Sequence, residues 1–151
     1  MSTLLYQDKP KYDLWLKYLL GSIVACTLIL GITYISQDTE AAIAMFSITI
    51  FDGLLFKAIL PRKFQIFDDK LRIVLGGPFS VSIALSNITE VKTVSGSKLT
   101  VYWGIKFATS ASNVVEIVRK KGLNLIISPD NPDMFLEQFK QAQKAGNSGR
   151  I

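Results

Sequence analysis

One carboxyl group stands inside an apolar stretch of the sequence, where ionisable side chains are rare. Asp52 belongs to the run 41–60 and lies eight residues before Leu60, which is about 12 Å along a helix. An aspartate at the centre of a bilayer costs roughly 2.5–3.5 kcal/mol on insertion scales, so it needs a partner. Ser22 and Thr27, in the preceding apolar run, are the candidate hydrogen-bond donors.

Asp52 is open to a functional and a structural interpretation. As a functional group it would be a proton or ion site, or a contact to a basic residue of another membrane protein. Because two helices cannot enclose a conduction path, a proton or ion site would suit a small accessory subunit of a membrane transport complex. As a structural group, Asp52 would join the two apolar segments through a hydrogen bond. We favour the structural interpretation, with a partner contact next.

The composition excludes several kinds of catalytic chemistry. The sequence has no histidine and one cysteine, Cys26, so His–Cys and Ser–His pairs and an internal disulfide are impossible. The carboxylates of Asp68, Asp69 and Glu90 fall in expected turns and strand edges, where no acid, base and nucleophile converge. We therefore expect a protein that is not an enzyme and that holds no cofactor and no metal.

Two further classes of ligand are not indicated. The glycines of Gly76-Gly77-Pro78 are not followed by a helix pattern with Lys-Ser or Lys-Thr, as a phosphate-binding loop requires. The sequence also lacks a basic stripe interleaved with stacking aromatic residues, which is typical of nucleic-acid binders. We expect neither a nucleic acid nor a small-molecule substrate as partner.

The elements that must position Asp52 are two apolar runs joined by a short connector. Residues 18–35 carry no formal charge, and the run 41–60 follows after only five residues. Each run matches the roughly 20 residues needed to cross a bilayer. The connector, 36–40, is long enough only for a tight turn. The sequence thus predicts a transmembrane hairpin over 14–60, with helices over 14–35 and 41–60.

Basic residues flank the outer ends of the two runs and are absent from the connector. They are Lys9, Lys11 and Lys17 before the first run, Lys57 near the end of the second, and Arg62 and Lys63 after it. The connector carries only Asp38 and Glu40. By the positive-inside rule this pattern predicts a two-pass protein of the cell membrane, with both termini in the cytoplasm. Residues 1–13 would then be a cytoplasmic N-terminal segment.

After the second run the hydrophobic period changes to two, which is typical of strands. The expected strands are 64–67, 71–75, 81–85, 88–94, 99–107, 114–119 and 123–127. Seven strands at this spacing predict a small antiparallel barrel or sandwich. Asn131 as N-cap and Pro132 at the first helical position then predict a helix. Its apolar stripe of Phe135, Phe139 and Ala142 would cap the open end, and 144–151 would form a flexible tail.

Seven strands followed by one amphipathic helix is the order of the pleckstrin-homology (PH) superfold. The segments 114–122 (VVEIVRKKG) and 126–135 (IISPDNPDMF) resemble the last two strands and the helix entry of bacterial and archaeal PH-like domains. Such proteins often carry one or two transmembrane helices before the domain. The resemblance covers about 61–142 and the hairpin layout, and it implies an α+β fold with a PH-like domain over 61–143. It implies little about function, because a fold does not determine one.

Classical members of the superfold hold inositol phosphates with a basic loop between the first two strands. Here that loop is Asp68-Asp69-Lys70, whose carboxylates repel phosphate. Our main hypothesis is therefore a non-enzymatic, membrane-anchored module that binds a protein partner or a second copy of itself. The short tether would raise its effective concentration at a membrane-bound partner. Tyr102 and Trp103 lie in an expected strand, where the exposed one of the two would mark a contact patch.

The alternative hypothesis is a domain that binds anionic lipid, beyond the lipid contacts of the hairpin itself. Five basic residues are the candidates for this contact: Arg62, Lys63, Arg119, Lys120 and Lys121. Each basic residue near an anionic surface contributes about 1 kcal/mol. Arg62 and Lys63 are also explained as basic residues that set the topology beside a membrane span. Lys120 and Lys121 are also explained as residues of a solvated turn.

Overall fold

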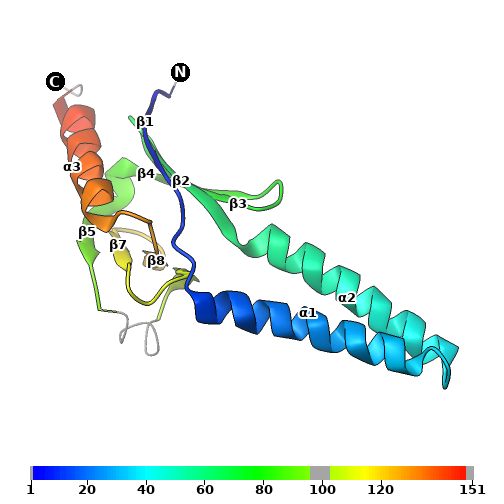
Figure 1. Cartoon of the computed structure of the whole chain (residues 1–151). Coiled ribbons are helices and arrows are strands. Elements are labelled where there is room, and N and C mark those ends of the chain that lie inside the picture. The colour runs from blue at the N-terminus through cyan, green and yellow to red at the C-terminus, as the bar shows by residue number, and fades with distance from the viewer. Residues whose placement is uncertain (1, 96–102, 149–151) are drawn as a thin grey trace.

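Two long helices project from a β-rich domain, as the computed structural model shows (Figure 1). The structure describes residues 2–95 and 103–148. The long helices are α1, Leu14–Tyr34, and α2, Thr39–Ile59, and a third helix, α3, spans Pro132–Ser148. The predicted pair of apolar helices ahead of a β domain is thus confirmed.

The hairpin formed by α1 and α2 combines apolar packing, such as Gly31 against the Phe46 ring, with a cap on α2 and one hydrogen bond between the helices in the described residues. The Asp38 carboxylate caps α2, because it accepts hydrogen bonds from the backbone N–H groups of Glu40 (3.0 Å) and Ala41 (3.1 Å). Thr49 Oγ1 donates to Thr27 Oγ1 across the pair at 3.0 Å. Most side chains of both helices are exposed, and each helix is long and apolar enough to cross a membrane.

The first sheet contains a strand that precedes the hairpin in the sequence. Its antiparallel strands, in spatial order, are β1 (Leu4–Asp8), β2 (Pro61–Phe67), β3 (Lys70–Leu75) and β4 (Ser80–Ala84). β1 pairs with β2 in a register that places Gln7 opposite Gln65 and Asp8 opposite Phe64. The hairpin is therefore an insertion between two neighbouring strands of one sheet.

The second sheet follows a 3₁₀ turn, η1, at Leu85–Asn87. Its strands, in spatial order, are β5 (Ile88–Thr93), β7 (Val115–Arg119), β8 (Leu125–Ile127) and β6 (Ile105–Phe107). β5, β7 and β8 pair antiparallel, but β6 runs parallel to β8, with Ile105 opposite Leu125.

The predicted α+β class and the C-terminal helix are confirmed, whereas the barrel and the count of seven strands are wrong. The two sheets do not close into a barrel, and the described part of the chain contains eight strands. The additional strand is β1, which a long-range pairing creates. Residues 99–102 of the expected strand 99–107 lie outside the described residues, and β6 begins only at Ile105.

The hydrophobic core lies between the two sheets and α3. Phe64, Ile73 and Ile117 are fully buried in it, as are Phe135 and Phe139 of α3. Asn131 caps α3 as predicted, since its Oδ1 accepts a hydrogen bond from the N–H of Met134 at 3.2 Å. The helix packs across β1, β2 and β5, so it covers both sheets rather than plugging the end of a barrel. It continues to Ser148, past the predicted boundary at 143.

Candidate functional site

The segment before α1 is built into the domain through backbone hydrogen bonds. The N–H of Lys11 donates to the carbonyl of Ser128 at 2.8 Å, and the N–H of Asp130 donates to the carbonyl of Lys9 at 2.8 Å. The N–H of Asp13 donates to the carbonyl of Thr109 at 3.0 Å. α1 therefore begins at a point that the second sheet and its loops define.

Asp13 fastens the first turn of α1 to the loop between β6 and β7. Its Oδ2 accepts hydrogen bonds from the N–H of Ala111 at 2.8 Å and from Trp15 Nε1 at 3.3 Å. The Ala111 bond and a smaller contribution from Ser110 stabilise the ionised form, so the pKa of Asp13 lies below its ordinary value. The side chain at the N-cap position thus holds another segment instead of capping its own helix.

The Asp13 contact should be visible in an acid titration of the folded protein. Because the folded-state pKa is lowered, the stability that this carboxylate contributes is present above its unfolded pKa of about 3.9 and is lost as the pH falls through the folded value. We expect the carboxyl ¹³C shift of Asp13 to titrate below pH 3.9. In Ala111→Pro, which lacks the donor N–H, the pH midpoint of the Asp13 titration should rise. A midpoint of about pH 3.9 in the unaltered protein would contradict the contact.

The end of α2 is fastened to the first sheet. Tyr12 Oη donates to the carbonyl of Pro61 at 2.5 Å, and the N–H of Gly76 donates to the carbonyl of Leu60 at 2.9 Å. Burial raises the pKa of Tyr12, an effect that the charge of Arg62 partly offsets. Glycine is required at position 76 by close approach, since a Cβ there would lie 1.7 Å from the carbonyl oxygen of Lys57. The base of the hairpin is thus held by both sheets.

A basic hollow opens beside this junction, on the outer face of β2 and β3. It has a volume of about 410 Å³ and is lined by Arg62, Lys63, Gln65, Arg72, Val74, Leu75, Gly76 and Gly77. Arg62 and Lys63 are basic residues expected from the sequence, whereas Arg72 was missed. The signal for Arg72 was the alternation of the expected strand 71–75, which places it on the outer face, opposite Gln65. We call this site the basic hollow.

The other predicted basic group lies at the opposite end of the domain. The N–H of Lys120 donates to the carbonyl of Asn87 at 2.8 Å, and η1 is joined to the β2–β3 turn through the N–H of Leu85 and the carbonyl of Asp69 (2.9 Å). That turn is separated from Gly76 by the length of β3, roughly 17 Å. Arg119 is half-buried, and its Nε donates to the carbonyl of Leu123 within its own turn. Arg119, Lys120 and Lys121 therefore do not join the basic hollow.

The polar residues of the hairpin are not brought together as the sequence suggested. Ser22 Oγ donates to the carbonyl of Leu19 at 2.8 Å, and Thr27 Oγ1 donates to that of Val24 at 3.0 Å. Asp52 is half-buried and makes no hydrogen bond or ion pair with any described residue. The hydroxyls satisfy carbonyls of their own helix, which is the nearest acceptor available to a helical Ser or Thr.

Replacement of Asp52 by Asn should ease insertion of α2 into a bilayer. The aspartate has no partner inside the described chain, so the change should recover part of the roughly 2.5–3.5 kcal/mol that a central aspartate costs. The apparent insertion free energy, measured by glycosylation mapping of the full hairpin, checks this. If a second membrane protein holds Asp52 through a basic residue, the effect of Asp52→Asn should be unfavourable in native membranes. The substitution would then release that partner.

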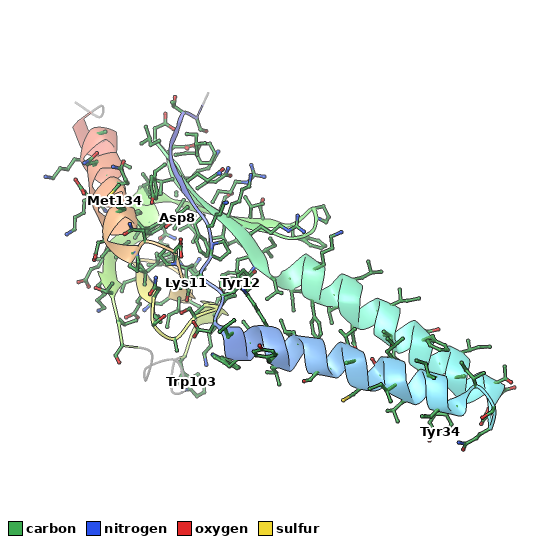
Figure 2. All side chains as sticks on the ribbon, in the orientation of Figure 1. Asp8, Lys11, Tyr12, Tyr34, Trp103 and Met134 are labelled. Atoms are coloured by element: carbon green, nitrogen blue, oxygen red, sulfur yellow. The ribbon has the colours of Figure 1, made fainter. Side chains whose placement is uncertain are left out.

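Trp103 is the most exposed large hydrophobic side chain in the described part of the chain, at 94%. Figure 2 shows it at the edge of the domain, pointing away from the sheets. Of the two aromatic residues in the expected strand, Trp103 is exposed, and Tyr102 lies outside the described residues. Tryptophan is enriched among the residues that contribute most to protein–protein binding, so Trp103 is a candidate contact residue.

Residues 2–95 and 103–148 contain no group of three or more His, Cys, Asp or Glu side chains that could hold a metal ion. In comparisons with curated proteins and with solved structures, nothing matches. The family model described as "Bacterial PH domain" matches residues 62–143. This region begins in β2 and ends in α3, so it contains both sheets except β1. Because the match covers more than half of the 151 residues and confirms the predicted resemblance, the chain belongs to the bacterial PH domain family.

Proposed function

We propose that this protein is a non-enzymatic assembly module, held at the cytoplasmic face of the cell membrane by its hairpin. The two helices would cross the bilayer twice, with both termini in the cytoplasm, as the basic residues flanking the hairpin indicate. The PH domain would bind a membrane-associated protein or a second copy of this chain. Domains of this family are typically not catalytic, which agrees with the proposal.

The observation that carries the proposal is the insertion of the hairpin between β1 and β2. A domain on a flexible linker would sample many orientations, whereas this domain is attached to both helices. Asp13 fastens α1 to the β6–β7 loop, and Gly76 fastens the end of α2 to the β3–β4 loop. A domain fixed in this way presents one defined surface to other membrane-bound proteins, which favours assembly by lowering the orientational entropy lost on binding.

Site-specific photocrosslinking of the full chain in its native membranes tests the partner. A photoreactive amino acid in place of Trp103 should give a discrete adduct, of about twice 16.8 kDa for self-association or of another defined mass for a different protein. The matched position is Lys140, an exposed residue of α3, a helix that packs on β1, β2 and β5; it should give no such adduct. The absence of adducts from position 103, or equal patterns from both positions, would contradict assembly through this surface.

A further inference from the structure

The basic hollow carries three cations that no carboxylate neutralises within the described residues. Arg62, Lys63 and Arg72 are all exposed, and none lies within 4.0 Å of an Asp or Glu oxygen. Like charges gathered in one concave site repel each other, so such a site favours an anion. The hollow also contains no acidic side chain in its lining.

The position of the hollow is set by its contact with the last turn of α2. A Cβ at Gly76 would meet the Lys57 carbonyl and lie 3.4 Å from Arg62 Nε, so the guanidinium group lies across the glycine beside that turn. Gly77 lies against Ala58, since a Cβ there would be 3.4 Å from the Ala58 Cβ. Where α2 leaves the hydrocarbon of a bilayer, the hollow therefore faces the phosphate groups.

An exposed aromatic side chain stands at the same level as the hollow. Phe79, which follows the Gly76-Gly77-Pro78 turn, is 60% exposed. A Cβ at Gly77 would lie 3.4 Å from its ring, so the ring folds over the glycine that touches α2. A phenylalanine beside cations at this height suits the boundary between headgroups and acyl chains, where apolar surface is removed from water.

We propose that the basic hollow binds the phosphate of an anionic phospholipid, with Arg62 and Arg72 as the principal ligands and Lys63 as a third cation. Arginine suits this role because its planar guanidinium group donates two parallel hydrogen bonds to one phosphate. Phe79 enters the bilayer beside the bound lipid and positions the loop. The inference rests on the membrane placement in the proposed function and goes beyond it by naming a ligand.

The lipid source is favoured over a free phosphate compound by the surroundings of the hollow. A soluble ligand would need no apolar neighbour, whereas here Phe79 and the apolar surface of α2 adjoin the cations. The site also differs from the loop between the first two strands of the family domain, because Asp68 and Asp69 occupy that loop at the other end of β3.

A lipid titration of the purified full chain by native mass spectrometry tests the site. The probes are dioleoyl phosphatidylglycerol and, as the zwitterionic comparison, dioleoyl phosphatidylcholine in a non-ionic detergent. The unaltered chain should prefer phosphatidylglycerol. The double variant Arg62→Gln with Arg72→Gln should raise the Kd for phosphatidylglycerol about 25-fold, since each basic residue at an anionic surface strengthens binding about fivefold.

The matched control removes the same charge elsewhere. Lys120→Gln with Lys121→Gln should change the Kd less than about twofold, because these lysines lie more than a Debye length from the hollow. Equal losses in both double variants, or no preference for phosphatidylglycerol, would overturn the inference. Displacement of the lipid by millimolar glycerol 3-phosphate would overturn the choice of a lipid as ligand.

Flotation of the same protein with phosphatidylcholine vesicles separates this inference from the proposed function. A chain that inserts into these vesicles but does not prefer phosphatidylglycerol retains the proposed membrane placement and lacks the lipid site. A chain that does not insert at all contradicts both. Retained near-ultraviolet circular dichroism in the double arginine variant shows that any loss of binding is not a loss of folding.

Discussion

Deletion of residues 2–8 from the full chain is expected to destabilise the domain by about 3–6 kcal/mol. The deletion removes β1, its ladder of hydrogen bonds with β2, and Tyr6, which packs against the core. Each lost backbone hydrogen bond contributes about 0.5–1.5 kcal/mol, and α3 would lose one of the strands that it covers. Small domains have only about 5–15 kcal/mol of stability in total, so much of the chain would be unfolded or aggregated.

The matched control is deletion of residues 145–151, which removes the same number of residues from the other end. Among the α3 side chains whose burial the structure describes, up to Ala145, the buried ones are Phe135, Phe139 and Ala142, and all three remain. We therefore expect a loss below about 1 kcal/mol, of the size usual for surface changes. Denaturant unfolding in detergent, followed by near-ultraviolet circular dichroism, measures both. Similar losses from the two deletions would show that β1 is not an integral strand.

Gly76→Ala is expected to separate the β3–β4 loop from α2 and to cost about 3 kcal/mol or more. The new Cβ would lie 1.7 Å from a backbone oxygen of α2, and backbone cannot move aside as a flexible side chain can. Relief of the clash requires the loss of the hydrogen bond from Gly76 N–H to Leu60 and a shift of the loop. Overpacking of this kind commonly costs 1–3 kcal/mol, and more where the backbone must move.

Gly77→Ala provides a control one residue away. Its Cβ would meet Ala58 and Phe79 at 3.4 Å, an ordinary contact distance, and neither glycine has a positive φ angle. We expect a change of less than about 1 kcal/mol, because alanine here fits the available space. Thermal unfolding of both variants gives the comparison. If Gly76→Ala unfolds with the same Tm as Gly77→Ala, the loop does not pack on α2 as described.

The parts of the fold that the sequence predicted are those with local signals. α3 begins at Pro132 because Asn131 and Pro132 are a cap and a first-turn residue, and its stripe of Phe135, Phe139 and Ala142 repeats with the helical period. The hairpin helices follow from two long apolar runs. These signals need no knowledge of distant residues.

The parts that were missed depend on long-range contacts. β1 has only five residues without clean alternation, and it becomes a strand by pairing with β2 across the whole hairpin. The parallel pairing of β6 with β8 likewise depends on a crossover connection between the two strands, which no local sequence pattern encodes. At the site, Arg62 and Lys63 were identified from their place after an apolar run. Arg72 joined them only through the register of β2 and β3.

The same long-range information separated the basic residues that the sequence had grouped. Lys120 and Arg62 look equivalent as surface cations, but they lie at opposite ends of β3. The predicted donors to Asp52 do not reach it, because the hydroxyls of Ser22 and Thr27 donate to carbonyls of their own helix. Charge and composition alone predict neither the separation of the two basic groups nor the acceptors of these hydroxyls.

Labelling of Cys26 with a membrane-impermeant maleimide tests the central claim most directly, because this is the chain's one cysteine and lies in α1. If the hairpin crosses the bilayer, Cys26 in intact cells should remain unlabelled until detergent is added. In a Cys26→Ser background, Gln37→Cys should label from outside the cell and Lys121→Cys only after the cells are opened. Labelling of Cys26 in intact membranes, or of Lys121→Cys from outside, would contradict a cytoplasmic PH domain held by a membrane hairpin.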